Sequence, residues 1–224
     1  MSMLTNLDLL RRVPMFSMLS ETQANALSEA VVKRRYKRGE RIVDQGSKSN
    51  ALYIILSGHC RVVMTDAKGR EVILATLTAG DHVGEMSLID NEAHSATVEA
   101  ESLTDVLELG REAFTRSLMD SASMSYTVLC GLVARLRIAD RKIGSLALMN
   151  VYGRVAHVLL DAANASPLKD MIIREKLSRQ DIAKMVGASR EMVSRVMKDF
   201  LDQGFIQALD GGAMRIVERR AKPR

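Results

Sequence analysis

The chain has 224 residues and a formal net charge of +5 at pH 7. Hydrophobic residues make up 47% of it, a share that is ordinary for a soluble protein. No run of about 18 apolar residues occurs, so we expect neither a membrane span nor a membrane partner. A chain of this length predicts two domains.

The two cysteines, Cys60 and Cys130, are isolated in the sequence. They make no cluster with metal-ligand spacing, and lone cysteines suit a reducing compartment. We therefore expect a cytoplasmic protein in which both cysteines are small, buried apolar residues.

The first 110 residues are punctuated by glycine and rich in short β-branched runs. Two helices, around 5–12 and 21–30, precede these runs, and Ser20 is placed to cap the second helix. Several runs alternate apolar and polar residues at period two, as a half-buried strand does. The pattern predicts an all-β barrel, roll or sandwich, with strands in RIVDQ, ALYIILSG, CRVVMTD, EVILATL, ATVEAES and DVLELG.

A long helix is predicted over 111–147. Its apolar residues recur at alternating steps of three and four, which is the a/d seam of a coiled coil and predicts a homodimer. The alternative is a single amphipathic helix packed on its own barrel. We favour the dimer because basic residues leave only a narrow apolar stripe. The seam comprises Leu129, Leu132, Leu136, Ala139, Ile143, Leu146 and Asn150.

Residues 178–206 have the pattern of a helix-turn-helix. Ser178 is a candidate cap of a first helix, with Asp181 at the capping-box distance. Gly187 ends that helix and Ser189 caps a second one. Two short helices joined by a turn that contains glycine form this motif. The inner face of the second helix is predicted to hold Met192, Val193, Val196, Met197 and Phe200.

The second helix opens with charged residues that suit base edges. Recognition helices read the major groove from their first turns, where Arg190, Glu191 and Arg195 stand. Arg suits guanine O6/N7, and Glu suits the cytosine amino group. The whole excess charge lies in 151–224, which has 14 Lys+Arg against 9 Asp+Glu. This distribution favours a DNA-binding domain over the alternative, a helical hairpin with solvated charges.

A two-stranded wing is predicted over 205–217, with Asp210-Gly211-Gly212 as its turn. Together, the elements and three motifs resemble the Crp/Fnr family of bacterial transcription factors over nearly the whole chain. LYIILSGHCRV is similar to the family's LYxIxSGxVxV strand-turn, and GDHVGEMSLIDNEAHSATVEA to its GxxxGExxL segment leading to R-S-A or R-T-A. VGASREMVSRVMK resembles the family's recognition helix and is the most specific of the three motifs.

The resemblance implies an α+β fold in three parts. A cyclic-nucleotide-binding-type β-roll domain would occupy 1–110, a long dimerisation helix and hinge 111–149, and a winged helix-turn-helix DNA-binding domain 150–224. A homodimeric, allosteric transcription regulator of this family would bind double-stranded DNA and have RNA polymerase as a partner.

For DNA, the family's R-E-x-x-x-R triad falls on Arg190, Glu191 and Arg195. The resemblance therefore implies TGTGA-type half-sites arranged as an inverted palindrome. Arg179 and Ser189 match phosphate-contacting positions, and Lys198 joins them. The expected DNA-binding set is Arg179, Ser189, Arg190, Glu191, Ser194, Arg195 and Lys198.

For an effector, the resemblance carries over in part. In members that bind cyclic AMP, a Gly-Glu pair opens a short helix, the Glu takes the ribose 2′-OH, and a following Arg-Ser holds the phosphate. Here His94 stands at the Arg position and offers one donor in place of a charged fork. Ala139 and Asp140 replace two hydroxyl residues that contact adenine. The expected ligand set is Gly84, Glu85, Met86, Ser87, His94, Ser95, Ala139, Asp140 and Arg141.

These departures disfavour cyclic AMP but keep the prediction of a cyclic nucleotide effector. Asp140 beside Arg141 suits a guanine base, and some members of the family respond to cyclic di-GMP. The alternative is that both residues are solvated flanks of the coiled coil, and an effector-independent regulator also stays open. We expect no metal, haem or iron–sulfur cluster, because the histidines are scattered and the N-terminal cysteine cluster of the iron–sulfur sensors is absent.

No catalytic residue is predicted. The sequence contains no Ser-His-Asp arrangement, P-loop, HExxH or paired-carboxylate motif. A nucleotide-processing enzyme is therefore only a remote alternative to a DNA-binding regulator.

Overall fold

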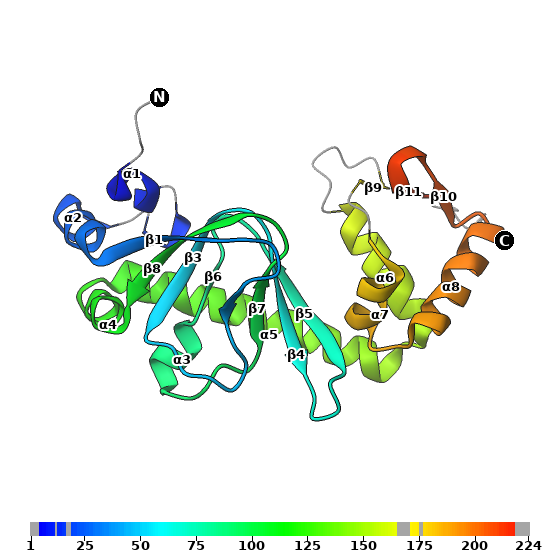
Figure 1. Ribbon diagram of the computed structural model, residues 1–224, viewed down its shortest axis with the longest axis horizontal. Coiled ribbons are helices and arrows are strands. Elements are labelled where there is room, and N and C mark those ends of the chain that lie inside the picture. Colours follow the sequence, from blue (N-terminus) through cyan, green and yellow to red (C-terminus); the bar gives the residue numbers. More distant parts are fainter. Residues whose placement is uncertain (1–4, 12, 17–18, 165–170, 175–176, 218–224) are drawn as a thin grey trace. The chain divides into compact units, whose positions relative to one another are not determined.

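The computed structural model describes residues 5–11, 13–16, 19–164, 171–174 and 177–217 (Figure 1). The chain divides into two compact units, Met1–Arg137 and Ile138–Arg224, with the division inside helix α5 (Ala122–Leu148). Among the described helices, none is long and apolar enough to cross a membrane.

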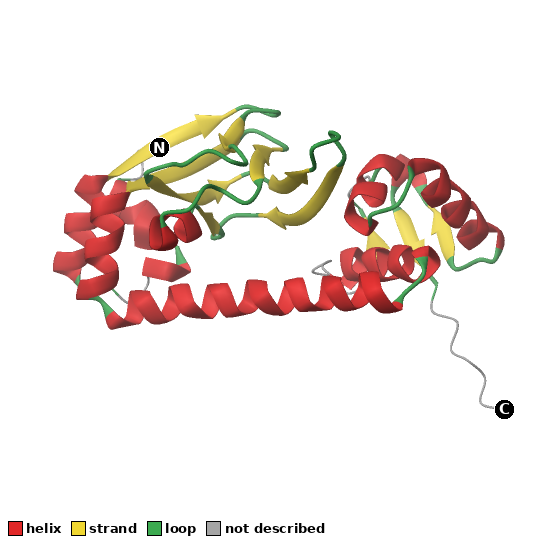
Figure 2. Ribbon diagram, turned by 90° about the horizontal axis from the view of Figure 1, so that it is seen from below, coloured by secondary structure: helices red, strands yellow, loops and turns green. Residues whose placement is uncertain are grey.

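Unit 1 opens with helices close to the predicted positions. They are α1 (Asn6–Arg11), the 3-10 helix η1 (Pro14–Phe16) and α2 (Glu21–Ala30). Ser20 caps α2 as predicted, because its side chain accepts from the Gln23 backbone N–H while Gln23 bonds back to the Ser20 N–H. Figure 1 and Figure 2 show α1 and α2 at one end of the sheets of this unit, whereas the long helix α5 runs along the sheets.

Two four-stranded antiparallel sheets form the roll, in the orders β1-β8-β3-β6 and β2-β7-β4-β5. All six predicted runs are strands, and β1 and β6 are additional. The strands are β1 (Val31–Tyr36), β2 (Arg41–Val43), β3 (Ala51–Ser57), β4 (Cys60–Thr65), β5 (Glu71–Leu77), β6 (His82–Val83), β7 (Thr97–Ala100) and β8 (Thr104–Gly110).

Strand β3 is nearly continuous in apolar residues because it is buried on both faces. Leu52 and Ile54 belong to the core beneath the helices of unit 1, together with Phe114 and Met124. Ile55 belongs to a second core that lies between the two sheets. The roll is therefore packed on both sides of its first sheet.

The predicted helix over 111–147 is wrong in one respect, because it is two helices. Helix α4 (Arg111–Asp120) ends at Ser121, whose backbone is extended, and α5 follows at once. The Ser121 hydroxyl accepts from the Met124 N–H at 3.3 Å, which compensates the opening of α5. A serine inside an otherwise helical pattern was too weak a signal to predict this break.

Unit 2 is a winged helix-turn-helix around its own core, as predicted. Helix α6 (Val151–Asn164) packs against α7 (Arg179–Val186) and α8 (Arg190–Asp202). The wing pairs β10 (Ile206–Ala208) with β11 (Met214–Ile216) around the turn η2 (Asp210–Gly212), and β9 (Ile172–Ile173) adds a third strand. The apolar faces of α7 and α8 meet α6 and the wing in one cluster.

Two burial predictions are wrong. Cys60 is buried, but Cys130 is exposed on α5. Met192 is 37% exposed, whereas Val193, Val196, Met197 and Phe200 are buried. Met192 falls beyond the edge of the apolar stripe of α8, which is narrower than the residue types suggest.

Candidate DNA interface and effector site

Three local features define the two helices of the helix-turn-helix: a cap at the start of each helix and a glycine at the end of α7. Ser178 accepts from the Asp181 N–H at 3.0 Å, and Ser189 accepts from the Met192 N–H at 3.2 Å. Gly187 ends α7 with a φ of 62°, in the left-handed region that glycine tolerates best. The caps and the turn are those predicted, and they set the direction in which α8 leaves α7.

Helix α8 separates an apolar face from a charged one. Its buried residues pack in the core of unit 2, so the opposite side is open to solvent. Hydrogen bonds from its own backbone and from Ser189 lower the pKa of Glu191, which keeps this carboxylate an acceptor. The exposed face carries the predicted base-reading and phosphate-binding residues Ser189, Arg190, Glu191, Ser194, Arg195 and Lys198, while Arg179 is partly buried.

A contact that the sequence did not predict anchors α8 to α6. The Tyr152 hydroxyl donates to the Asp199 carboxylate. The Tyr152 ring meets Phe200 edge-on, with 6.0 Å between ring centroids. These residues are 47 positions apart, and no local pattern connects them. Helix α8 is therefore held near its C-terminal end as well as at its N-terminal cap.

The candidate effector site begins where β6 passes into α3 (Glu85–Asp90). We call Gly84 and α3 the effector cassette. Gly84 has a φ of 96°, and a Cβ on it would lie 2.6 Å from the carbonyl oxygen of Ala51. Only glycine fits this close approach. Glu85, which opens α3, is 1% exposed and so points into the protein rather than into solvent.

The partner of Glu85 is Arg135 of α5, which was not among the predicted site residues. Arg135 Nη1 lies 2.5 Å from Glu85 Oε1, and its Nη2 donates to the carbonyl of His82. The second carboxylate oxygen, Oε2, is buried with no hydrogen-bond partner among the described residues. Burial raises the pKa of Glu85, and Arg135 opposes that rise. A buried, unpaired acceptor suits a ligand that brings a hydroxyl donor.

His94 is 9% exposed and is bonded within the protein. Its Nε2 lies 2.8 Å from Ser49 Oγ, and burial lowers the pKa of the ring. The lowered pKa favours the neutral form of the imidazole, which gives no charge to an anion. Ser87 is likewise engaged, since its hydroxyl donates to the Glu92 carbonyl at 2.6 Å.

The remaining predicted ligand residues are open to solvent. Met86 is 50% exposed, and Ser95 is exposed on the segment before β7. Ala139, Asp140 and Arg141 are exposed on α5, in unit 2. The structure thus places Gly84, Glu85, Met86 and Ser87 on one short segment and adds Arg135 to it.

The seam residues of α5 are mostly exposed. Leu129, Leu136, Ile143 and Leu146 expose 58%, 61%, 64% and 56% of their surface. Leu132 is the exception, because it packs against the core of unit 1. Large apolar side chains exposed in a row are the feature that a partner helix would cover.

No group of three or more His, Cys, Asp or Glu side chains that could hold a metal ion occurs among the described residues.

Comparisons with known proteins agree with this arrangement of domains. Residues 33–121 match the cyclic nucleotide-binding domain model, and residues 153–221 match the Crp-like helix-turn-helix domain model. The cAMP-activated global transcriptional regulator Vfr of Pseudomonas aeruginosa is 35% identical over 181 residues, which cover 78% of this chain and 84% of Vfr. The corresponding regulator CRP of Escherichia coli O6:H1 is 33% identical over 178 residues, which cover 78% of this chain and 84% of CRP.

The chain belongs to the Crp/Fnr family of transcriptional regulators. Solved structures share its fold. The regulator CLP of Xanthomonas campestris, described as c-di-GMP responsive, has a TM-score of 0.77 at 24% identity and covers 89% of this chain and 100% of its own. The catabolite activator protein of Thermus thermophilus has a TM-score of 0.54 at 29% identity and covers 91% of this chain and 93% of its own.

Membership of the Crp/Fnr family confirms the predicted fold class, with a cyclic-nucleotide-binding-type roll followed by a helix-turn-helix domain. It also confirms DNA binding and transcription regulation as the protein's class of function.

Proposed function

We propose that this Crp/Fnr regulator binds a TGTGA-type palindrome as a homodimer and responds to a cyclic nucleotide. The observation that carries the proposal is the exposed face of α8, where Arg190, Glu191 and Arg195 stand beside one another on a helix capped by Ser189. Arg190 and Arg195 would each bind a guanine, and Glu191 would accept from a cytosine amino group.

Phosphate contacts would come from residues around this face. Ser189 lies at the start of α8 and Lys198 further along its exposed side, and Arg179 opens α7. Such contacts fix the register of the protein on DNA without reading sequence. Ser194 is exposed on the same helix, and its hydroxyl would contact either a base or a phosphate.

A homodimer is proposed through the dimerisation helix and hinge, 111–149. The four exposed seam residues of α5 support it, since an isolated protomer leaves them in water. Two recognition helices related by a two-fold axis would read an inverted repeat with half-sites about 34–36 Å apart. We further propose RNA polymerase as the partner on DNA and the cytoplasm as the location.

A cyclic nucleotide would bind at the effector cassette. The buried and unpaired Glu85 Oε2 suits a ribose hydroxyl. Arg135 pairs with the other oxygen of the same carboxylate, Oε1. The two relatives named above are described as cAMP-activated. The neutral His94, bonded to Ser49, supports a weaker hold on phosphate than an arginine would give.

Cyclic di-GMP is the second candidate effector. Asp140 and Arg141 are both exposed on α5, where a carboxylate and a guanidinium could pair with guanine. A regulator that needs no effector is the third reading, and it predicts that no nucleotide changes DNA affinity.

DNA recognition is tested by selecting sites from a randomised duplex library with the full chain. The expected outcome is an inverted repeat with TGTGA half-sites. Gel-shift titrations then compare the selected palindrome with one in which a half-site is scrambled, and the scrambled site should bind at least about tenfold more weakly. Selection of an unrelated motif would overturn the assignment of the triad.

The effector is tested by calorimetry with cyclic AMP, cyclic GMP and cyclic di-GMP, with the nucleotide recovered afterwards to exclude turnover. Glu85→Gln should weaken any ribose-dependent ligand, whereas Asp140→Ala should affect a guanine ligand alone. Tight cyclic AMP binding that Asp140→Ala leaves unchanged would decide against cyclic di-GMP. Hydrolysed ligand would favour an enzyme.

A further inference from the structure

The effector cassette is held at its far end by one arginine. Helix α3 is six residues long and stops at Asn91, whose φ is 60°. The last carbonyls of a helix have no partner within it. Two of those in α3 are taken by Arg111, whose Nη1 donates to the Leu88 carbonyl at 2.9 Å and whose Nη2 donates to the Ser87 carbonyl at 3.2 Å.

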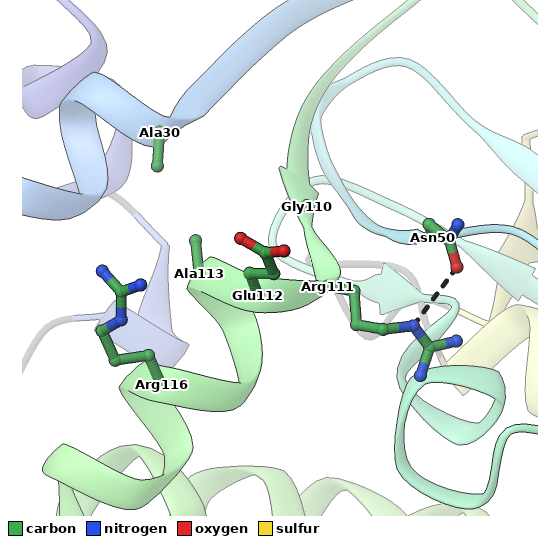
Figure 3. Close-up of a pocket in the computed structure, with 7 residues that line it drawn as sticks. All are labelled: Ala30, Asn50, Gly110, Arg111, Glu112, Ala113 and Arg116. Carbon is green, nitrogen blue, oxygen red and sulfur yellow. Dashed lines mark hydrogen bonds between the residues drawn. The ribbon is translucent and has the colours of Figure 1, made fainter.

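The same arginine is bound to the segment before β3. Its backbone N–H donates to the Asn50 carbonyl at 2.7 Å, and its Nε lies 3.2 Å from Asn50 Oδ1. Figure 3 shows Arg111 directed toward Asn50, whereas Arg116, on the same helix, points to the other side of the pocket. Arg111 is also the first residue of α4, so its side chain joins α3 to the start of that helix.

The two ends of α3 are therefore gripped by two consecutive helices. Arg135 of α5 binds Glu85 at the start of α3, and Arg111 of α4 binds Ser87 and Leu88 near its end. Helices α4 and α5 are joined at Ser121 without an intervening loop. A displacement of α3 by a ligand must move or break one of these two grips.

We propose that Arg111 is a positioning residue that couples the effector cassette to α4 and, through the break at Ser121, to α5. This rests on the proposed function in that the cassette is the effector site. A guanidinium is needed because three of its donors are used at once in a planar array. Lysine would keep the positive charge at the end of α3 but could not reproduce that array.

If Arg111 had only a structural role, its loss would lower stability without changing the effect of a bound nucleotide on the helix break or on DNA affinity. The test therefore uses Arg111→Gln and Arg111→Lys in the full chain, with Arg116→Gln as a matched control on the same helix, exposed to solvent. Hydrogen exchange is measured over α3 and over residues 118–124. Operator affinity is measured without nucleotide and with cyclic AMP, cyclic GMP and cyclic di-GMP in turn.

In Arg111→Gln, amides of α3 and of residues 118–124 should both exchange about tenfold faster or more, while β3 and β8 keep their protection. The nucleotide-induced change in DNA affinity, in either direction, should shrink at least about fivefold, with unliganded DNA affinity within about twofold of wild type. Arg111→Lys should be intermediate, which keeps the test decisive if the glutamine variant folds poorly. Arg116→Gln should behave as wild type.

Faster exchange confined to α3, or an unchanged nucleotide effect on DNA affinity despite faster exchange in α3, would overturn the coupling. If the wild-type chain binds no nucleotide, the proposed effector function fails by itself. The exchange at residues 118–124 still decides whether Arg111 connects α3 to the helix break.

Discussion

The regions proposed to bind DNA and the effector, called the recognition region and the effector region, are built in opposite ways. The recognition region lies within about twenty consecutive residues, and its side chains point into solvent from a helix with local caps. The effector region gathers Gly84, Glu85 and Arg135 across 50 residues of sequence, with the carboxylate almost completely buried. Substitutions in the first should change binding and leave folding intact, whereas substitutions in the second should change both.

The largest effect is expected at the seam of α5. Its residues are exposed in one protomer, as in the recognition region, but a second chain would bury them, as residues of the effector region are buried. Leu129→Asp with Leu136→Asp would place four carboxylates in the dimer interface. The dimer dissociation constant should rise at least about a thousandfold, roughly 4 kcal/mol or more, and operator binding should fall.

Sedimentation measures this change, and circular dichroism should show an unaltered fold because both leucines are exposed in the protomer. The control is Ile138→Asp, a residue 41% exposed and off the seam. An unchanged dimer in the double variant would contradict the seam.

Gly84→Ala should show how far effector-site chemistry depends on folding. The new Cβ would meet the Ala51 carbonyl and force a positive φ on alanine, at a cost of roughly 2–4 kcal/mol. Gly69→Ala is a matched control, since Gly69 also has a positive φ, of 76°, but no atom within 4 Å of its added Cβ. Its cost should be about 1 kcal/mol. If chemical denaturation shows that both variants lose the same free energy of unfolding, the close approach of Gly84 to the Ala51 carbonyl does not explain the need for glycine.

Acid should weaken the effector region through His82. Burial, with a smaller effect of Arg135, lowers the pKa of His82 from 6.5 to about 4. Between these values the unfolded chain binds the proton that the folded chain excludes, so stability falls as pH falls from 6.5 towards 4. One pKa unit corresponds to about 1.4 kcal/mol, so a shift from 6.5 to about 4 gives a full loss of roughly 3.5 kcal/mol.

The measurement is the free energy of unfolding of wild type and His82→Gln from pH 7 to pH 4. The difference between the two proteins should shrink or reverse on acidification, because glutamine does not titrate. The structure supports a buried ring, because His82 packs beside Gly131 of α5, with about 3.5 Å between its Cε1 and a Cβ placed on that glycine. Parallel pH profiles would instead show that His82 is solvated.

In the recognition region the expected effects are smaller and leave folding intact. Arg190→Ala should cost on the order of 1–3 kcal/mol of binding and relax the preference at one guanine. Its free energy of unfolding should stay within about 0.5 kcal/mol of wild type, because the side chain is exposed.

Lys198→Ala provides the contrast on the same helix. This substitution should weaken binding to all DNA sequences alike. It should also reduce the slope of log K against log salt concentration by about one, because one phosphate contact is lost. Titrations of single-base variants at several salt concentrations separate the two effects. Equal losses of specificity from both substitutions would contradict the division between base and phosphate contacts.

Local patterns in the sequence determined much of this protein. The six strand runs, the caps Ser20, Ser178 and Ser189, and the glycine turn of the helix-turn-helix could all be predicted. Each depends on neighbours within a few residues, either through the period of apolar side chains or through a hydroxyl that reaches a nearby N–H. The exposed, charged face of α8 was predictable for the same reason.

The tertiary structure decided the features that join distant segments. Strand β1 reads VVKRRY, and its charges hid a strand whose Arg34 and Arg35 pair with Glu108 and Asp105 of β8. The Arg135–Glu85 pair, the His94–Ser49 bond and the grip of Arg111 on α3 also escaped prediction. A buried charge or hydrogen-bonding group must find a partner, but the partner's position in the sequence is unconstrained until the chain has folded, and only the packed structure selects it.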